Sequence, residues 1–101
     1  MFIYNITTKV DHSVLEPWIH WQKEIHIPEI MATGFFSEHR FYKLLEHDDE
    51  VGAVFVTQFL AVTRNDYDSY ILQCATGLRK KAFEKWGDRI VSFRTLLQNV
   101  Q

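Results

Sequence analysis

Hydrophobic and polar positions follow two different periods along the chain, and these periods divide it into strands and helices. From Phe2 to Val10 apolar and polar residues largely alternate, which is typical of a strand with one buried face. From Val14 to Thr33 apolar residues recur every three or four positions, as in a helix that buries one side. The predicted strands cover 2–10, 35–46, 53–62 and 90–98, an acidic turn at 47–50 joins the middle two, and the predicted helices cover 14–33 and 63–86. This order, βαββαβ, indicates an α+β fold.

A proline interrupts the first helical pattern. Pro28 disfavours the α conformation for the residue before it, Ile27. We therefore expect the helix to kink or pause at His26 and Ile27, before a last turn that ends at Gly34. Such a kink would hold His26 in a defined direction, which makes it a candidate for a functional residue.

The third predicted strand is apolar on both faces, with Phe55 and Phe59 on one and Val56 and Leu60 on the other. Two helices cover only one face of a four-stranded sheet, so the second face needs another cover. A large apolar patch on a small chain usually marks an interface. The simplest cover is a second copy, and we expect a homodimer packed sheet to sheet.

Composition limits the classes of partner. With 101 residues, 47% of them hydrophobic and 24% charged, the chain fits one globular domain over 1–101. The formal net charge of -2 and the scattered Lys and Arg residues supply no basic face for nucleic acid. No apolar stretch reaches the ~20 residues of a membrane-spanning helix. We expect a mature chain that begins at Met1, lies in the cytoplasm and contacts neither nucleic acid nor membrane.

Signatures of common cofactors and metals do not occur. The sequence has no dinucleotide fingerprint, P-loop, C-x-x-C or G-x-S-x-G motif, so we expect no cofactor. His20 and Glu24 are spaced like two metal ligands, but they fall on the polar side of the first helix without a second pair, and we expect no metal site. Cys74 falls on the apolar stripe of the second helix, where we expect it to pack as a small hydrophobic residue.

Several motifs together resemble a known family. They are F-I-Y-N at the start, W-x-x-W in the first helix, H-I-P-E-I-M-A-T-G-F-F from His26, and V-S-F-R-T-L-L in the last strand. The chain resembles the bacterial family named domain of unknown function 4286, which is similar to the dimeric α+β barrel superfamily. The resemblance covers nearly the whole chain. It implies a ferredoxin-like subunit, with a four-stranded antiparallel sheet and two helices on one face, in a sheet-to-sheet dimer. It implies no catalytic residues, because the family is uncharacterised.

Polar side chains inside the apolar strands are the candidates for a binding site, since burying one without a partner is costly. One interpretation places them beneath the helices, beside His26 and two tyrosines, in a pocket for a small anion or an aromatic acid. The candidate pocket residues are Asn5, His26, Arg40, Gln58, Tyr67, Tyr70 and Arg94. The other interpretation is structural: Asn5 and Gln58 bond neighbouring strands or the dimer partner, the arginines pair with carboxylates such as Glu38, and His26 bonds a carbonyl freed by the proline.

Two functional hypotheses follow from these residues. The first is a small dimeric module, binding or structural, with a small-molecule pocket between helices and sheet. The alternative is a cofactor-independent enzyme, of the oxygenase, isomerase or decarboxylase type, that acts on an aromatic or lipophilic acid; dimeric α+β barrel relatives suggest it by analogy of fold alone. The sequence does not decide whether the protein is an enzyme, and it identifies no catalytic residue.

Overall fold

The computed structural model describes residues 1–46, 48, 50 and 52–101. The acidic turn predicted at 47–50 includes positions that lie outside the described residues. The strands are β1 (Phe2–Asp11), β2 (Glu38–Lys43), β3 (Gly52–Ala61) and β4 (Ile90–Gln98). The helical segments are η1 (His12–Val14), α1 (Leu15–Trp21), η2 (Gln22–His26), α2 (Ile27–Met31), α3 (Arg64–Tyr70), η3 (Ile71–Ala75), α4 (Thr76–Trp86) and η4 (Gly87–Arg89).

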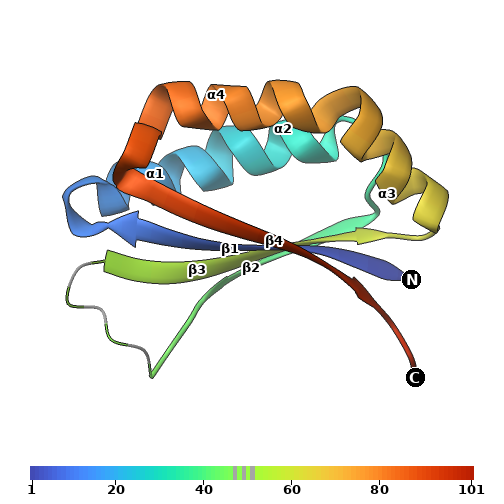
Figure 1. Cartoon of the computed structure of the whole chain (residues 1–101), viewed down its shortest axis with the longest axis horizontal. Coiled ribbons are helices and arrows are strands. Elements are labelled where there is room, and N and C mark those ends of the chain that lie inside the picture. Colours follow the sequence, from blue (N-terminus) through green and yellow to red (C-terminus); the bar gives the residue numbers. More distant parts are fainter. Residues whose placement is uncertain (47, 49, 51) are drawn as a thin grey trace.

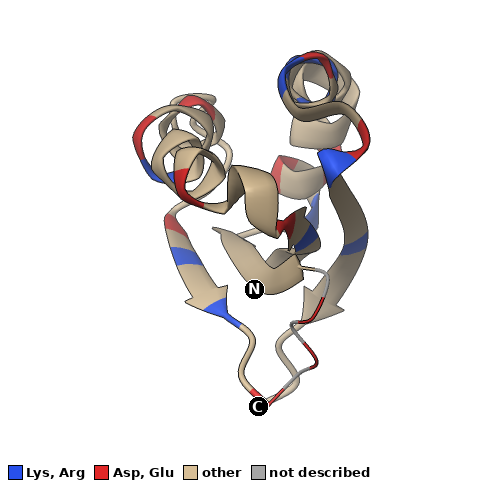
Figure 2. Ribbon diagram, turned by 90° about the vertical axis from the view of Figure 1, so that its left-hand side faces the viewer, with Lys and Arg blue, Asp and Glu red and all other residues tan. Residues whose placement is uncertain are grey.

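Both helical regions lie on one face of the sheet, as the βαββαβ pattern predicts. The strands form an antiparallel sheet in the order β2-β3-β1-β4. The first helical arm, α1-η2-α2, and the second, α3-η3-α4, run above this sheet (Figure 1). An end-on view shows the two arms side by side over a curved sheet whose other face they leave uncovered (Figure 2). We call that other face the open face.

Strand register assigns each side chain to a face. Tyr4 lies opposite Phe59 and Asn5 lies opposite Gln58, so alternate residues of β1 and β3 point the same way. The side chains of Tyr4 and Phe59 belong to the core beneath the helices. Val56, one of the apolar residues on the second side of β3, therefore belongs to the open face, and the prediction of two apolar faces is confirmed.

The core beneath the helices consists of two clusters of apolar side chains. One surrounds Tyr4, with Phe36, Phe59 and Tyr70 among its members. The other lies toward the opposite end of β1 and contains Val10, Trp18, Phe55 and Trp86. Between the two clusters the sheet carries polar residues, and this gap positions the candidate site described below.

The predicted interruption of the first helix occurs, but one turn earlier than expected and in another form. Ile27 is helical, with φ -58° and ψ -48°, so the expectation that Pro28 would push it out of the α region is wrong. Instead, η2 is a π-helical turn in which the Ile27 N–H donates to the carbonyl of Gln22. In a regular α-helix the residue at position 28 would donate a backbone N–H, which proline lacks. The π-helical turn is wider than an α-helical turn, and it changes the backbone hydrogen bonds just before Pro28.

The second arm begins and ends where the sequence predicts. The Thr63 hydroxyl accepts a hydrogen bond from the Asp66 N–H at 3.1 Å, which caps α3. Gly87 follows α4 with a positive φ of 58°, a conformation that favours glycine. Neither arm is both long enough and apolar enough to span a bilayer, and the same holds for every helix in the described part of the chain.

Candidate functional site: a cleft between the helices and the sheet

A line of polar side chains separates the two core clusters on the helix-facing side of the sheet. The Gln22 amide donates to the Thr57 hydroxyl at 3.0 Å, and both residues are buried. The Thr8 and Ser92 hydroxyls lie 3.0 Å apart. Arg94 follows Ser92 on the same side of β4. We call these five residues the polar seam; they run from the centre of the sheet to its β4 edge.

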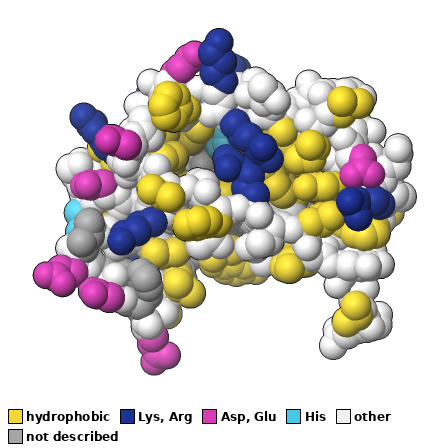
Figure 3. Space-filling view, in the orientation of Figure 1, with side chains coloured by type: hydrophobic (Ala, Val, Ile, Leu, Met, Phe, Trp, Pro, Cys, Tyr) yellow, Lys and Arg dark blue, Asp and Glu magenta, His cyan; other side chains and the backbone are white. Residues whose placement is uncertain are grey.

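Two adjoining hollows follow the outer half of the polar seam. An outer one of about 260 Å³ lies between α4 and β4, with Phe83 and Ile90 in its wall. An inner one of about 30 Å³ reaches beneath the first arm to Trp18 and His26. Both hollows are lined by Ala82, Ile90, Ser92 and Arg94, so we treat them as one helix–sheet cleft. On this face Lys and Arg side chains gather beside a small patch of His and among hydrophobic side chains (Figure 3).

Unused hydrogen-bonding atoms belong to the wall of the inner hollow. Trp18 is only 1% exposed, yet its Nε1 has no hydrogen-bond partner among the described residues. The same is true of Nδ1 of His26, so the expected bond from this histidine to a freed carbonyl is not formed through that atom. A buried polar atom without a partner costs about 1–3 kcal/mol, and native structures rarely retain one without a reason. The inner hollow therefore offers bonding capacity that the chain itself does not use.

His26 is held in its place and kept neutral. The π-helical turn η2 carries both Gln22 and His26 to the cleft, and the His26 ring stacks on Trp21 with centroids 4.4 Å apart and planes 16° apart. Burial lowers the pKa of His26 to about 4; Glu29 opposes this shift, whereas Arg94 and Lys81 add to it. At neutral pH the side chain is thus an uncharged imidazole that can accept a proton or a hydrogen bond.

The cleft contains positive charges and no described carboxylate. Arg79 extends from α4 and donates from Nη2 to the Tyr4 hydroxyl at 3.0 Å. Arg94 has no carboxylate partner among the described residues. Since no Asp or Glu lines either hollow, the two guanidinium groups are not neutralised by described groups of the wall.

Three of the predicted pocket residues lie on the opposite side of the sheet from His26. Asn5, Arg40 and Gln58 occupy positions of β1, β2 and β3 that belong to the open face. The expectation that they share a pocket with His26 is therefore corrected: strand side chains alternate, and Asn5 lies between Tyr4 and Ile6, which face the helices. The Gln58 amide donates to Asn5 Oδ1 at 3.1 Å, as the structural interpretation proposed.

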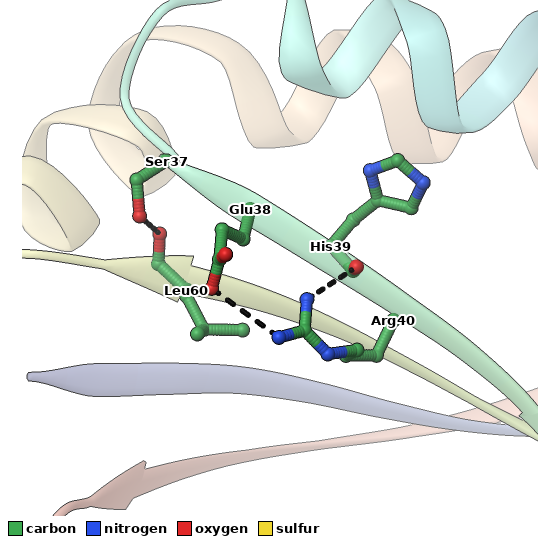
Figure 4. A network of polar contacts seen from close by, with 5 residues as sticks. All are labelled: Ser37, Glu38, His39, Arg40 and Leu60. Carbon is green, nitrogen blue, oxygen red and sulfur yellow. Dashed lines mark hydrogen bonds and ion pairs between the residues drawn. The ribbon is translucent and has the colours of Figure 1, made fainter.

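Arg40 is paired within its own strand. Its guanidinium donates to the Glu38 carboxylate at 3.4 Å and to the His39 carbonyl at 3.1 Å (Figure 4). This is the ion pair with Glu38 that the structural interpretation predicted. Arg40, Gln58, Asn5 and Thr95 are consecutive neighbours in the register of the four strands, and we call them the polar row of the open face.

The two predicted tyrosines belong to the core rather than to the inner hollow. Tyr67 and Tyr70 pack around Tyr4, with ring centroids 5.6 and 5.7 Å from it. Burial raises the pKa of Tyr70, and the neighbouring Tyr4 raises it further, so Tyr70 stays protonated at neutral pH. Of the seven predicted residues, the structure brings only His26 and Arg94 together in the inner hollow.

Other residues of the cleft were not predicted as site residues. Ser92 lies two positions before Arg94 on β4, so the alternation of the strand signals that both share a side. Trp18 was expected only in the core, and its unpaired N–H is a feature of packing that no spacing reveals. Gln22 lies four positions after Trp18, and its N–H donates to the Trp18 carbonyl, so regular helical spacing places both on the side that faces the sheet.

The strand order and the two helical arms on one face of the sheet define a ferredoxin-like fold. The chain belongs to the family described as Domain of unknown function (DUF4286), which matches residues 1–100, and the resemblance in its motifs is confirmed. No curated protein matches it.

Solved structures are similar to the chain over nearly its whole length. One is a dimeric ferredoxin-like protein from an uncultured marine organism, with a TM-score of 0.72, 11% identity, and coverage of 99% of this chain and 95% of that one. Another is an ethyl tert-butyl ether d (ethd) family protein from Bacillus halodurans, with a TM-score of 0.69, 7% identity, and coverage of 99% and 100%. A third is SnoaB, a cofactor-independent oxygenase from Streptomyces nogalater, with a TM-score of 0.64, 13% identity, and coverage of 99% and 94%. At these identities the likeness shows the fold.

Proposed function

We propose that this protein is a homodimer, joined through the open faces of its two sheets, in which each subunit binds a small molecule in the helix–sheet cleft. The observation that carries the binding function is the inner hollow, where the buried Trp18 carries an unpaired N–H and neutral His26 carries an unpaired nitrogen. That hollow of about 30 Å³ has room for one small polar group, and the adjoining outer hollow of about 260 Å³, lined by Ala82, Phe83 and Ile90 together with Ser92, Arg79 and Arg94, would take the rest of the ligand. The location of the protein in the cytoplasm stays a prediction.

The open face supports the dimer. Tyr42 of β2 and Val91, Phe93 and Leu97 of β4 project from it as exposed apolar side chains. An apolar surface shared by several strands is unfavourable in water and usually marks an interface. A second copy offers the same patch, so a two-fold axis would cover both at once. Solved structures that share the fold include proteins described as dimeric.

Binding can be observed directly at Trp18. In ¹⁵N-labelled protein the indole N–H signal of Trp18, assigned with Trp18→Phe, should move when small fragments enter the cleft. We would screen one-ring and two-ring carboxylates, amides and amines at millimolar concentration, with the other indole signals as references. Movement of the Trp18 signal by any of these classes supports a binding site. If no fragment moves it, the proposed binding function is wrong.

A second function, cofactor-independent catalysis, is favoured by the state of His26. A neutral imidazole at the wall of the cleft has an unpaired nitrogen that can accept a proton from a bound acid without a cofactor, although its lowered pKa makes it a weak base. Every fragment that binds should be incubated with the protein in air and analysed by mass spectrometry. Catalysis predicts a changed fragment that wild-type protein forms and that His26→Gln forms at least about 100 times more slowly. Fragments that bind but return unchanged, in both proteins, would favour a binding module.

A further inference from the structure

We infer that the cleft binds a small monocarboxylate with an aromatic or branched apolar body, and that the Arg94 guanidinium binds the carboxylate group. This inference rests on the proposed binding function and names the class of ligand.

The charge of the wall selects an anion. Both arginines of the cleft lie in its outer hollow, which no described carboxylate lines. Arg79 already donates to the Tyr4 hydroxyl, whereas Arg94 has no carboxylate partner among the described residues. An unpaired guanidinium in a partly enclosed hollow attracts an anion, and its planar fork fits the two oxygens of a carboxylate.

Arg94 stands where the two hollows meet. It lines both of them, with Ser92 before it on the same side of β4 and Ile6 beside it on β1. A carboxylate bound there would also lie near the Ser92 hydroxyl. The arginines of the open face and of α3 are different, because Arg40 and Arg64 pair with Glu38 and Asp68.

The apolar part of the wall sets the size of the ligand. The outer hollow of about 260 Å³ lies below the ~300–1,000 Å³ of sites for drug-sized molecules, so it suits a single ring or a short branched chain. Ile90 and Ala82 form its inner side, and the ring of Phe83, 70% exposed, stands at its rim. An exposed phenylalanine beside a hollow is covered when an apolar body binds against it.

The test compares phenylacetate with its neutral amide, which has the same shape, and with the cation benzylamine, by calorimetry and by the Trp18 indole signal. Wild-type protein should bind phenylacetate at least about ten times more tightly than phenylacetamide. Added salt should weaken the binding of phenylacetate and leave that of the amide unchanged. Arg94→Gln should remove this preference and Arg94→Lys should restore part of it. Arg64→Gln is the matched control: it removes an exposed arginine outside the cleft and should leave the preference unchanged.

The outcomes separate this inference from the proposed function. If phenylacetamide or benzylamine binds as tightly as phenylacetate at the Trp18 site, the cleft is a binding site but the carboxylate inference is wrong. Circular dichroism would show whether Arg94→Gln is folded. If the folded variant still binds phenylacetate more tightly than phenylacetamide, Arg94 does not bind the carboxylate and the inference names the wrong residue. If none of the probes binds and no fragment moves the Trp18 signal, the inference and the proposed function both fail.

Discussion

Replacing Phe93 by lysine should convert the dimer into folded monomers. Phe93 is 67% exposed on the open face of one subunit, so a lysine there costs little while the subunit is alone. In a sheet-to-sheet dimer the same position would be covered, and burying an unpaired ammonium group is strongly unfavourable. Sedimentation at micromolar concentration should show a mass near 12.0 kDa for the variant and twice that for the wild type. Circular dichroism should show that the variant stays folded.

Two controls make this result specific. Leu72→Lys changes an apolar side chain that is 85% exposed on η3, away from the open face, and should leave the dimer intact. On β3, the Val56 side chain lies on the open face, so Val56→Lys should dissociate the dimer. The side chain of its neighbour Phe55 lies in the core, so Phe55→Lys should unfold the subunit. A wild-type protein that sediments only as a monomer would contradict the proposed dimer. A Phe93→Lys variant that sediments with the mass of the wild-type dimer would contradict the proposed interface.

Acid should destabilise the protein through His26 before most carboxylates titrate. The unfolded chain takes up a proton at this side chain near its ordinary pKa of 6.5, but the folded protein resists it down to about 4. Between these values the unfolded state binds more protons, so the stability that neutral His26 provides is present above 6.5 and is lost as the pH falls. From about pH 7 to pH 5 the loss should be roughly 2 kcal/mol. Urea unfolding at constant protein concentration measures it.

His26→Gln isolates this contribution. The variant cannot titrate at position 26, so its free energy of unfolding should change less between pH 7 and pH 5, by about the same 2 kcal/mol. The charges that act on His26 are those of Glu29, Arg94 and Lys81, and all of them remain in the variant. Parallel pH profiles for wild type and variant would mean that His26 titrates near its ordinary pKa and lies in contact with water.

Alternation along the strands was enough to separate the two faces of β3, but not to say which face the helices cover. Phe55 and Val56 are both apolar, so the strand itself does not distinguish inside from outside. For Asn5 and Gln58 the sequence left two interpretations open, a pocket beneath the helices or a bond between neighbouring strands, and the structure shows the second. Their bond to each other on the open face depends on the register between two strands 53 positions apart in sequence.

The candidate site depended on packing even more than the fold did. The proline at position 28 correctly signalled an irregular helix, and it drew attention to His26. The sequence did not indicate that the irregularity would be a π-helical turn that leaves Ile27 helical. Nor did it show that Trp18, a plain core residue by its spacing, would retain an unpaired N–H beside a hollow. The unpaired Trp18 N–H results from the packing of several helices and strands against one another, and no pattern in the neighbouring sequence indicates it.

The polar row on the open face of each subunit can fix how the two sheets of the proposed dimer align with each other. Apolar patches alone would let two sheets slide or rotate against each other at little cost, because one aliphatic contact resembles the next. Among the described residues, the one bond between the Gln58 and Asn5 side chains leaves the Asn5 amide N–H groups and the Gln58 side-chain carbonyl free to bond elsewhere. In the proposed dimer only a few alignments of the two rows would satisfy these groups, so the row would select one docking geometry from many of similar apolar area.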